Sequence, residues 1–369
     1  MRHTFLQLLR CPTCKGQLQV TPFKESPDKG DVIEGILNCG CGSNYPIINT
    51  IPRMLNNAFE LFPSFVRYHK DHLPPSLPTQ PEGGFEKKTQ DMLTKTQQSF
   101  GYQWTTFSEM VCDFRENFWN YLYPATPDSF QGRLGLDAGC GFGRHIYHAA
   151  SCGAEMVGMD FSQAIDATYQ NTKHLPNVHL VQADIYAPPF SEGLFDFIYS
   201  IGVLHHLPDP ARGLRTLAPL LKQHGLLSLW VYSKERWAIN FVLEALRAMT
   251  TRLPHPAVKA LSFLGALMDR YVFILPYQAL KRVPSLGRTI EEVAPARIKN
   301  YSQYPFQVLY ADWFDRLAAP IRFYYNETEV NQLMQSVGLS GILVTQTGNY
   351  GWRACGTKPT SASTCNHDG

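Results

Sequence analysis

The sequence predicts an α/β protein: a parallel sheet with helices on both faces, a helical insertion and a small N-terminal domain. From residue 133 onward, short apolar runs alternate with longer amphipathic stretches, as expected for strands connected by helices. Four of the nine cysteines lie within the first 41 residues, which marks that segment as a unit of its own. Hydrophobic residues make up 44% of the 369-residue chain, enough for a sizeable core in two or three domains.

The expected strands and helices follow from the length and period of the apolar pattern. A capping box at Asn326–Glu329 opens the last helix of the series. The amphipathic stretches near 144–152, 162–174, 211–222 and 327–337 are the expected helices. The expected strands are the apolar runs at 134–138, 155–159, 178–182, 195–200, 226–232, 342–345 and 352–356.

Changes in composition divide the chain into segments. Residues 74–84 are rich in proline and glycine, so they cannot form a helix interior or a central strand. The expected segments are a cysteine-rich domain at 1–56, a linker at 57–84, a helical cap at 85–132, a sheet core at 133–232 and 326–358, a helical insertion or lid at 233–325, and a disordered tail at 359–369.

A glycine-rich loop follows the first strand of the core. Gly139, Gly141 and Gly143 occupy every second position before an expected helix, and glycine allows both a positive φ and close approach of a ligand. The amides at the start of the helix can bind an anion. A dinucleotide-binding G-x-G-x-x-G pattern would need glycine at 144, where Arg144 stands, so the spacing disfavours NAD.

Two acidic residues follow the next two strands. Asp160 is placed to accept hydrogen bonds from a ribose diol, and Asp184 to bind an adenine amino group. In an open parallel sheet, ligands bind outside the carboxyl ends of the strands, where both acids and the glycine loop are expected.

The runs LDAGCGFGRH, GMDFS, VQADI and FDFIYSIGVLHHLPDP resemble class I S-adenosylmethionine-dependent methyltransferases of the type-11 group. The resemblance covers 133–232 well and 326–358 more loosely, and it implies a Rossmann-like sheet of seven strands. It implies that the glycines contact the methionine end of the cofactor and that Ser200 lies near the methyl group. Asp137 either binds the cofactor or braces the loop. The implied cofactor-binding residues are Asp137, Gly139, Gly141, Gly143, Asp160, Phe161, Asp184, Ile185 and Ser200.

The chemistry implied is in-line attack on a sulfonium methyl group, with the nucleophile held within about 3–3.5 Å. A general base is needed only for an acceptor whose proton has a high pKa. The candidate bases are His205 and His206, because histidine titrates near neutral pH, although in the family this pair often only shapes the pocket. Residues 200–203 lack the Asn/Asp-Pro-Pro-Tyr signature of nucleic-acid amino methyltransferases.

The N-terminal cysteines read C-x2-C, 24 residues, then C-x-C. Two thiolate pairs of this kind provide the tetrahedral ligands of a structural Zn²⁺, which would stabilise a domain with a small core. The surrounding runs LLRCPTCKGQL and LNCGCGSNYPIINTIPRML resemble the zinc-ribbon-like partner subunit of tRNA and release-factor methyltransferases. The predicted zinc ligands are Cys11, Cys14, Cys39 and Cys41.

The insertion has two interpretations. Residues 234–288 hold nine Lys/Arg and three acids, with an apolar helix face that includes Val258, Leu261 and Leu264. This is either a lid packed over the sheet or a basic, apolar surface that contacts a membrane peripherally. The residues at 100–104 and 310–320 resemble segments of zinc-ribbon-fused methyltransferases, either packed in the core or lining the substrate pocket. The substrate-pocket candidates are Trp104, Tyr310, Asp312 and Trp313.

These observations favour methylation of oxygen or carbon in a small-molecule acceptor, lipophilic or sugar-linked. The alternatives are an RNA-base methyltransferase and a non-catalytic scaffold that binds the cofactor. A net charge of +2 disfavours nucleic-acid binding by bulk charge. The odd number of cysteines and the lack of an export signal or a clean apolar span predict a cytoplasmic protein with reduced thiols.

Overall fold

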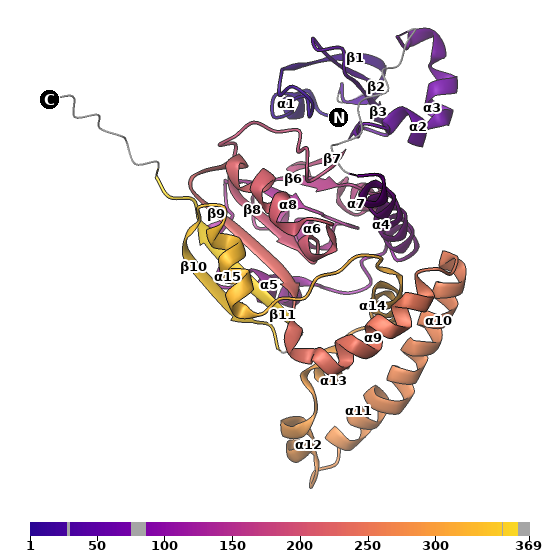
Figure 1. Cartoon of the computed structure of the whole chain (residues 1–369), viewed down its shortest axis with the longest axis vertical. Helices are drawn as coiled ribbons and strands as arrows, with labels where there is room; N and C mark the ends of the chain where they lie inside the picture. The colour runs from indigo at the N-terminus through magenta and orange to yellow at the C-terminus, as the bar shows by residue number, and fades with distance from the viewer. Residues whose placement is uncertain (28–29, 75–85, 349, 361–369) are drawn as a thin grey trace, which may run out of the picture.

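A computed structural model describes residues 1–27, 30–74, 86–348 and 350–360. Its centre is one twisted sheet in the order β1-β2-β3-β4-β7-β6-β5-β8-β9-β11-β10 (Figure 1). The strands are β1 (Leu18–Glu25), β2 (Val32–Cys39), β3 (Asn44–Ile48), β4 (Ile51–Met54), β5 (Leu134–Ala138), β6 (Glu155–Asp160), β7 (Val178–Ala183), β8 (Phe195–Ile201), β9 (Leu221–Tyr232), β10 (Ser340–Gln346) and β11 (Gly351–Thr357).

The seven strands of the predicted core are confirmed. Strands β7, β6, β5, β8 and β9 are parallel, and β11 and β10 complete the sheet as an antiparallel pair. One difference is that β9 begins at Leu221, inside the stretch expected to be helical, because the preceding helix ends at Leu217. The helices that connect these strands are α6 (Arg144–Ser151), α7 (Ala164–Thr172), α8 (Pro210–Leu217) and α15 (Glu327–Gln335), with the 3₁₀ turns η3 (Leu204–His206) and η4 (Ala218–Leu220).

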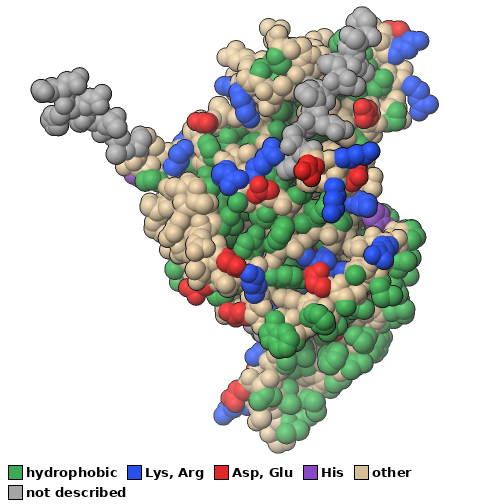
Figure 2. All heavy atoms as spheres, in the orientation of Figure 1, with side chains coloured by type: hydrophobic (Ala, Val, Ile, Leu, Met, Phe, Trp, Pro, Cys, Tyr) green, Lys and Arg blue, Asp and Glu red, His purple; other side chains and the backbone are tan. Residues whose placement is uncertain are grey.

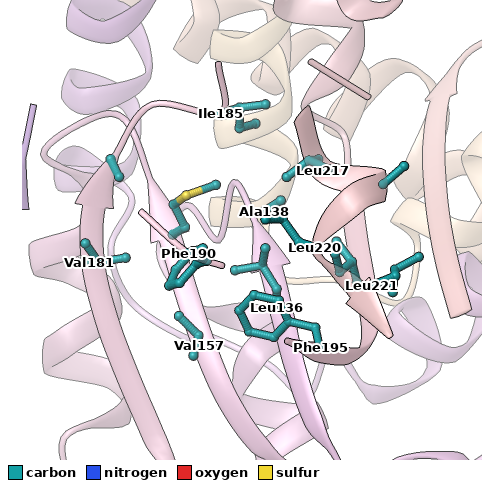
Figure 3. Packing of buried hydrophobic residues seen from close by; sticks show 14 of the residues in the cluster. Leu136, Ala138, Val157, Val181, Ile185, Phe190, Phe195, Leu217, Leu220 and Leu221 are labelled. Atoms are coloured by element: carbon teal, nitrogen blue, oxygen red, sulfur yellow. The ribbon is translucent and has the colours of Figure 1, made fainter. Parts of the chain in front are cut away.

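Both faces of this sheet are buried, as a parallel sheet requires. In β8, Phe195 and Ile198 pack on the face covered by α8 and α15, whereas Phe197 and Tyr199 pack on the face covered by α6 and α7. Figure 3 shows Leu136 of β5 beside Phe195 in the first of these layers. The strand ends are therefore held by two dense layers of apolar side chains.

The cysteine-rich segment is joined to the core sheet rather than separate from it. β4 pairs in parallel with β7, with Arg53 opposite Gln182 and Met54 opposite Ala183. Helix α1 (His3–Leu6) also packs onto the core, because Phe5 and Leu9 belong to the same buried cluster as Leu136. The sequence did not predict this junction.

Part of the segment predicted as a linker is folded. Residues 58–72 form α2 (Ala58–Leu61), α3 (Pro63–Tyr68) and η1 (Lys70–His72). The physical reason is that Phe65 stacks on Phe23 of β1 and His69 packs against the same ring at a tilt. The Nε2 of His69 also lies 2.9 Å from a carboxylate oxygen of Glu34. Residues 75–85 and the predicted tail beyond residue 360 lie outside the described part of the chain.

The segments predicted as a cap and an insertion contain helices. The cap comprises α4 (Lys87–Thr106), α5 (Arg115–Leu122) and η2 (Pro127–Ser129). In Figure 1 the insertion projects from the end of β9, away from the N-terminal strands. It consists of η5 (Lys234–Arg236), α9 (Trp237–Thr250), α10 (His255–Met268), the π-helical turn η6 (Asp269–Ile274), α11 (Leu275–Lys281), α12 (Gly287–Val293), α13 (Ala296–Tyr301) and α14 (Phe306–Ala318).

The apolar stripe of the insertion does not pack over the sheet. Helix α10 packs against α14 through a row that contains Val258, Ser262 and Ala266. Leu261 and Leu264, predicted to share the buried face with Val258, are 41% and 60% exposed. Small side chains let the two helices approach closely, so the large ones lie on the solvent side. Among the residues that the structure describes, no helix is long and apolar enough to cross a membrane.

Candidate active site

A cavity of about 590 Å³ lies at the carboxyl ends of the core strands. One end is lined by the glycine loop after β5 and by the residues that follow β6 and β7. The other end is lined by α5, α13 and α14, and α9 forms one wall. A ligand bound at the strand ends therefore shares a cavity with any ligand held by the insertion.

The glycine loop has the backbone conformation that the sequence predicts. Gly139, Gly141 and Gly143 all have positive φ, at 97°, 55° and 92°. A Cβ atom at Gly139 would lie 2.3 Å from a methyl group of Val203, so this position has no room for a side chain. Gly139 and Gly141 line the cavity, whereas Gly143 lies behind the loop and lets α6 approach Thr168 of α7.

Asp160 ties the end of β6 to the glycine loop. One of its carboxylate oxygens accepts a hydrogen bond from the amide of Gly141 at 2.9 Å, and the other accepts from the amide and hydroxyl of Ser162 at 2.8 and 2.7 Å. Burial raises the pKa of Asp160 above its usual value. The oxygen bonded to Gly141 accepts only this one hydrogen bond, so its second lone pair retains acceptor capacity.

Three more of the predicted cofactor residues line the same end of the cavity: Phe161, Asp184 and Ile185. The carboxylate of Asp184 accepts the amide hydrogen of Tyr186 at 2.9 Å, and burial raises the pKa of Asp184. The cap contributes as well, because the side-chain amide of Gln97 in α4 donates to the carbonyl of Phe161 at 2.8 Å.

Asp137 and Ser200 lie behind the loop and do not line the cavity. The hydroxyl of Ser200 donates to the carbonyl of Ala138 at 2.9 Å, which braces β8 against β5. Asp137 is 1% exposed beside the hydroxyl of Tyr199, and burial raises its pKa to about 8. Of the two interpretations of Asp137, this placement fits a brace for the loop.

The pKa of Asp137 gives a prediction for stability. Because the folded-state pKa exceeds the unfolded value of about 3.9, ionising Asp137 opposes folding, and its contribution to stability is lost as pH rises from about 4 to about 8. The limiting slope is about 1.4 kcal/mol per pH unit. We expect Asp137→Asn to flatten the pH dependence of the free energy of unfolding between pH 5 and 8, measured by urea denaturation.

The matched control is Asp128→Asn, which alters an exposed carboxylate. Its free energy of unfolding should depend on pH in the same way as that of the native chain. The same pH dependence in Asp137→Asn would contradict the raised pKa of Asp137.

The two histidines after β8 differ in their surroundings. His206 lines the cavity, and its Nδ1 lies 2.7 Å from the carbonyl of Ile321. This contact makes Nδ1 the protonated nitrogen of the neutral ring and leaves Nε2 as the acceptor. Burial lowers the pKa of His206. His205 is fully buried against Tyr232 and does not line the cavity, so this candidate base lies away from any acceptor bound there.

The predicted substrate residues also separate into two groups. Trp104 and Asp312 line the cavity, and Trp104 stacks on Phe142 of the glycine loop with ring centroids 5.0 Å apart. Tyr310 and Trp313 do not line it, because they pack among the insertion helices. The indole of Trp313 donates to Asp269 at 2.7 Å, and the Tyr310 hydroxyl donates to the carbonyl of Lys259 at 3.1 Å.

Several polar residues of the cavity were not identified from the sequence. The hydroxyl of Tyr232 donates to Asp315 at 2.6 Å, and Asp312 forms an ion pair with Arg316 at 2.6 Å. Arg236 is half-buried, and its pKa is lowered by burial and by neighbouring guanidinium groups. Within the described part of the chain, the side chain of Arg236 forms no ion pair, although the Asp312 carboxylate interacts with it at longer range. These residues carry no motif, because the packing of α9, α13 and α14 brings them together.

The four predicted zinc ligands converge at one point of the N-terminal domain. Their sulfur atoms all lie within 4.8 Å of one another, with Cys11 and Cys41 at 3.8 Å and Cys14 and Cys39 at 3.4 Å. Tetrahedral Zn²⁺ with Zn–S bonds of about 2.3 Å requires sulfur atoms about 3.8 Å apart. The donor set and its spacing therefore fit a structural Zn²⁺, and four thiolates leave no open coordination position for catalysis.

Arg53 of β4 connects the N-terminal domain to the cofactor end of the cavity. Its buried guanidinium makes two hydrogen bonds with Asp166 of α7, at 2.6 and 3.2 Å, and donates to Gln182 of β7 at 3.1 Å. The amide of Gln182 in turn donates to the carbonyl of Phe161 at 3.2 Å. The N-terminal strands therefore help to position the backbone next to Asp160.

Comparison with known proteins identifies the core. Residues 136–229 match the family model described as a methyltransferase domain. This range contains the glycine loop, both acids at the strand ends and the two histidines. The comparison thus agrees with the family that these motifs resemble.

Curated relatives match only part of the chain. An uncharacterised protein of Synechococcus is 36% identical over 129 residues, 31% of each chain. A tRNA U34 carboxymethyltransferase of Pseudoalteromonas atlantica is 35% identical over 115 residues, 30% of this chain and 35% of that one. The chain spans about a third of the length of these relatives. Among solved structures, human N-acetylserotonin methyltransferase in complex with S-adenosylmethionine is 14% identical, with a TM-score of 0.44 over 74% of this chain and 60% of that one.

Proposed function

We propose that this chain, which carries a methyltransferase domain of the type-11 family at residues 136–229, transfers a methyl group from S-adenosylmethionine to oxygen or carbon of a small-molecule acceptor. The observation that carries the proposal is the shared cavity, which is lined both by the cofactor residues and by the polar residues of the insertion. A volume of this size is typical of small-molecule sites.

The chain's own residues have distinct roles in this proposal. Gly139 and Gly141 allow the backbone to approach the methionine end of the cofactor, Asp160 accepts hydrogen bonds from the ribose, and Asp184 with Ile185 lies around the adenine. When bound, S-adenosylmethionine supplies an electrophilic sulfonium methyl group. Catalysis then depends mainly on holding the acceptor atom in line with that methyl group and on excluding water.

The acceptor end of the cavity favours a polar or anionic group on the substrate. Arg236 faces this end without an ion pair among the described residues, whereas Arg316 and Arg297 are paired with Asp312 and Asp269. An anionic group on the acceptor would provide the missing partner through a charge-assisted hydrogen bond.

His206 is the residue best placed to act as a general base for a hydroxyl acceptor. Its lowered pKa keeps the ring neutral at pH 7, and Nε2 carries the lone pair. We expect His206→Asn to lower kcat by about 100-fold. For the native chain, kcat should fall with decreasing pH below about pH 6.5. This acidic limb of the pH–rate profile should be absent in the variant.

The control for this variant is its affinity for S-adenosylmethionine, measured by calorimetry, which should stay within twofold of the native value. An unchanged kcat at every pH would show that His206 only shapes the cavity.

The function itself is tested with methyl-labelled S-adenosylmethionine. The purified chain is incubated with labelled cofactor and a lysate of the source organism, and the label is partitioned into solvent-soluble, acid-precipitable and small aqueous fractions. We expect the label in the solvent-soluble or the small aqueous fraction. An Asp160→Ala variant in parallel should transfer none. Tight cofactor binding without transfer to any fraction would favour the scaffold interpretation.

An RNA acceptor is the second candidate, because several of the curated relatives are named tRNA U34 carboxymethyltransferase. Two of these alignments, of 115 and 126 residues, are too short to include both the whole cofactor region and the whole insertion, whereas a third, with the Psychromonas ingrahamii protein of the same name, spans 195 residues at 28% identity. The two short alignments therefore support cofactor binding more than the choice of acceptor. Label in the acid-precipitable fraction that is sensitive to ribonuclease would favour this candidate and contradict the small-molecule proposal.

A further inference from the structure

The solvent side of the insertion is an almost purely apolar surface. From Leu253 to Leu280, every exposed residue is apolar, including Leu264, Tyr271 and Phe273. On α9, Glu244 is the only charged residue among the exposed ones. Figure 2 shows this region as a continuous green patch over the lower helices. We call it the apolar surface, and it includes Trp237, Phe241, Val242, Leu246, Met249, Leu261, Phe263, Leu264, Met268, Tyr271, Val272 and Phe273.

This concentration of apolar side chains needs an explanation. Among the described residues, all exposed large hydrophobic side chains but four lie between Trp237 and Val293. Several are mostly exposed, with Trp237 at 77%, Phe241 at 74% and Tyr271 at 65%. Contiguous apolar patches of this extent on a water-soluble domain mark interaction sites.

Basic residues outnumber acidic ones around the apolar surface, and the exposed acids Glu235, Glu291 and Glu292 lie at its two ends. Between 236 and 290 the acidic residues are Glu244 and Asp269. Glu244 accepts hydrogen bonds from Arg322 and Arg247, and Asp269 is buried and paired with Arg297. The charges of these two acids are thus neutralised by arginine side chains of the same chain.

The cations, by contrast, remain at the edges of the surface. Arg252 is exposed at one end of the helical run 255–281, and Lys281 and Arg282 are exposed at the other. Lys281 is paired with Glu291, whereas Arg252 and Arg282 have no ion pair within the described ranges. A partner with apolar and anionic components complements this arrangement.

We propose that the apolar surface docks onto an anionic lipid bilayer, with α9, α10 and α11 lying in the plane of the interface. Helices with apolar side chains on one side and cations at the border bind membranes in this orientation. The opposite sides of the helices are occupied within the protein, because α10 packs on α14 and α9 lines the cavity. A second copy of the chain is a poorer partner, because it would bring the same cations together.

The docking would place the acceptor end of the cavity next to the lipid. Asn240, Leu243 and Arg247 of α9 line the cavity, while Phe241 and Val242 of the same helix belong to the apolar surface. A single helix therefore separates the cavity from the proposed bilayer. The docking is independent of the proposed reaction, because lipid binding needs neither cofactor nor turnover.

The test is co-sedimentation of the full chain with vesicles of phosphatidylcholine containing about one third phosphatidylserine, without cofactor. We expect binding to these vesicles at least tenfold stronger than to pure phosphatidylcholine, and weaker at high salt. The double variant Phe241→Ser, Leu264→Ser should bind about 100-fold more weakly, because two large apolar side chains no longer enter the interface. The variant Arg252→Gln, Arg282→Gln should lose the preference for anionic lipid.

A matched double variant, Tyr68→Ser, Leu343→Ser, removes exposed apolar side chains from other surfaces and should bind like the native chain. Thermal unfolding confirms that each variant is folded. Equal binding of the native chain and Phe241→Ser, Leu264→Ser would overturn the proposal. The proposal would also be overturned if the native chain does not bind vesicles and is a dimer by light scattering, while the variant Phe241→Ser, Leu264→Ser is a monomer.

Discussion

Asp160→Ala is expected to lower the affinity for S-adenosylmethionine by at least about 100-fold. A hydrogen bond to a charged group contributes about 1.5–3 kcal/mol, and the variant loses the carboxylate proposed to accept the ribose hydroxyls. It also loses the contacts that hold the amide of Gly141 and the Ser162 turn, so the glycine loop is no longer fixed. Isothermal titration calorimetry measures the effect directly.

The appropriate control is Asp128→Ala, which removes an exposed carboxylate that does not line the cavity. Its affinity should equal that of the native chain. A further variant, Asp160→Asn, keeps one acceptor oxygen for Ser162. Its affinity for S-adenosylmethionine should lie between those of the native chain and Asp160→Ala. Native affinity in Asp160→Ala would mean that the cofactor is held elsewhere.

Disruption of the four-cysteine cluster, the proposed zinc site, is expected to have the second large effect, on thermal stability. Zinc binding to small cysteine-rich domains supplies on the order of 10 kcal/mol of folding free energy. The double variant Cys11→Ser, Cys14→Ser should bind no zinc and should melt at least about 10 °C lower. Metal content is measured by elemental analysis, with one zinc per chain expected for the native protein.

The same variant should also bind S-adenosylmethionine more weakly, because unfolding of β4 removes Arg53 from Asp166 and Gln182. Cys152→Ser is the matched control, since Cys152 lies outside the cluster. It should retain both zinc and cofactor affinity. A native chain without zinc, or unchanged melting after removal of a bound zinc, would contradict a structural role for the metal.

The core of the fold could be predicted because its signals are local. A buried parallel strand must be an apolar run, and a ligand must bind where such strands end. Asp160 and Asp184 therefore lie at the predicted edge of the cavity. The cysteine cluster follows the same logic, since a metal site requires a fixed set of donor atoms that two turns can supply.

The parts that could not be predicted depend on packing between distant segments. The apolar pattern of α10 has a helical period, but a period does not say which row faces the protein. The small residues Ser262 and Ala266 face α14, and the larger Leu264 faces solvent. Likewise, Arg236 and Asp315 reach one cavity only because the insertion folds back over the strand ends.

The pairing of β4 with β7 also covers one edge of the seven-stranded core sheet. In the strand order, β7 has β6 on one side and β4 on the other, so its backbone is not a free edge. An uncovered edge strand offers unpaired amides and carbonyls to any other extended chain, which is a route to aggregation. The N-terminal strands thus cover the β7 edge of the core sheet, and a shortened chain beginning after residue 56 would expose this edge.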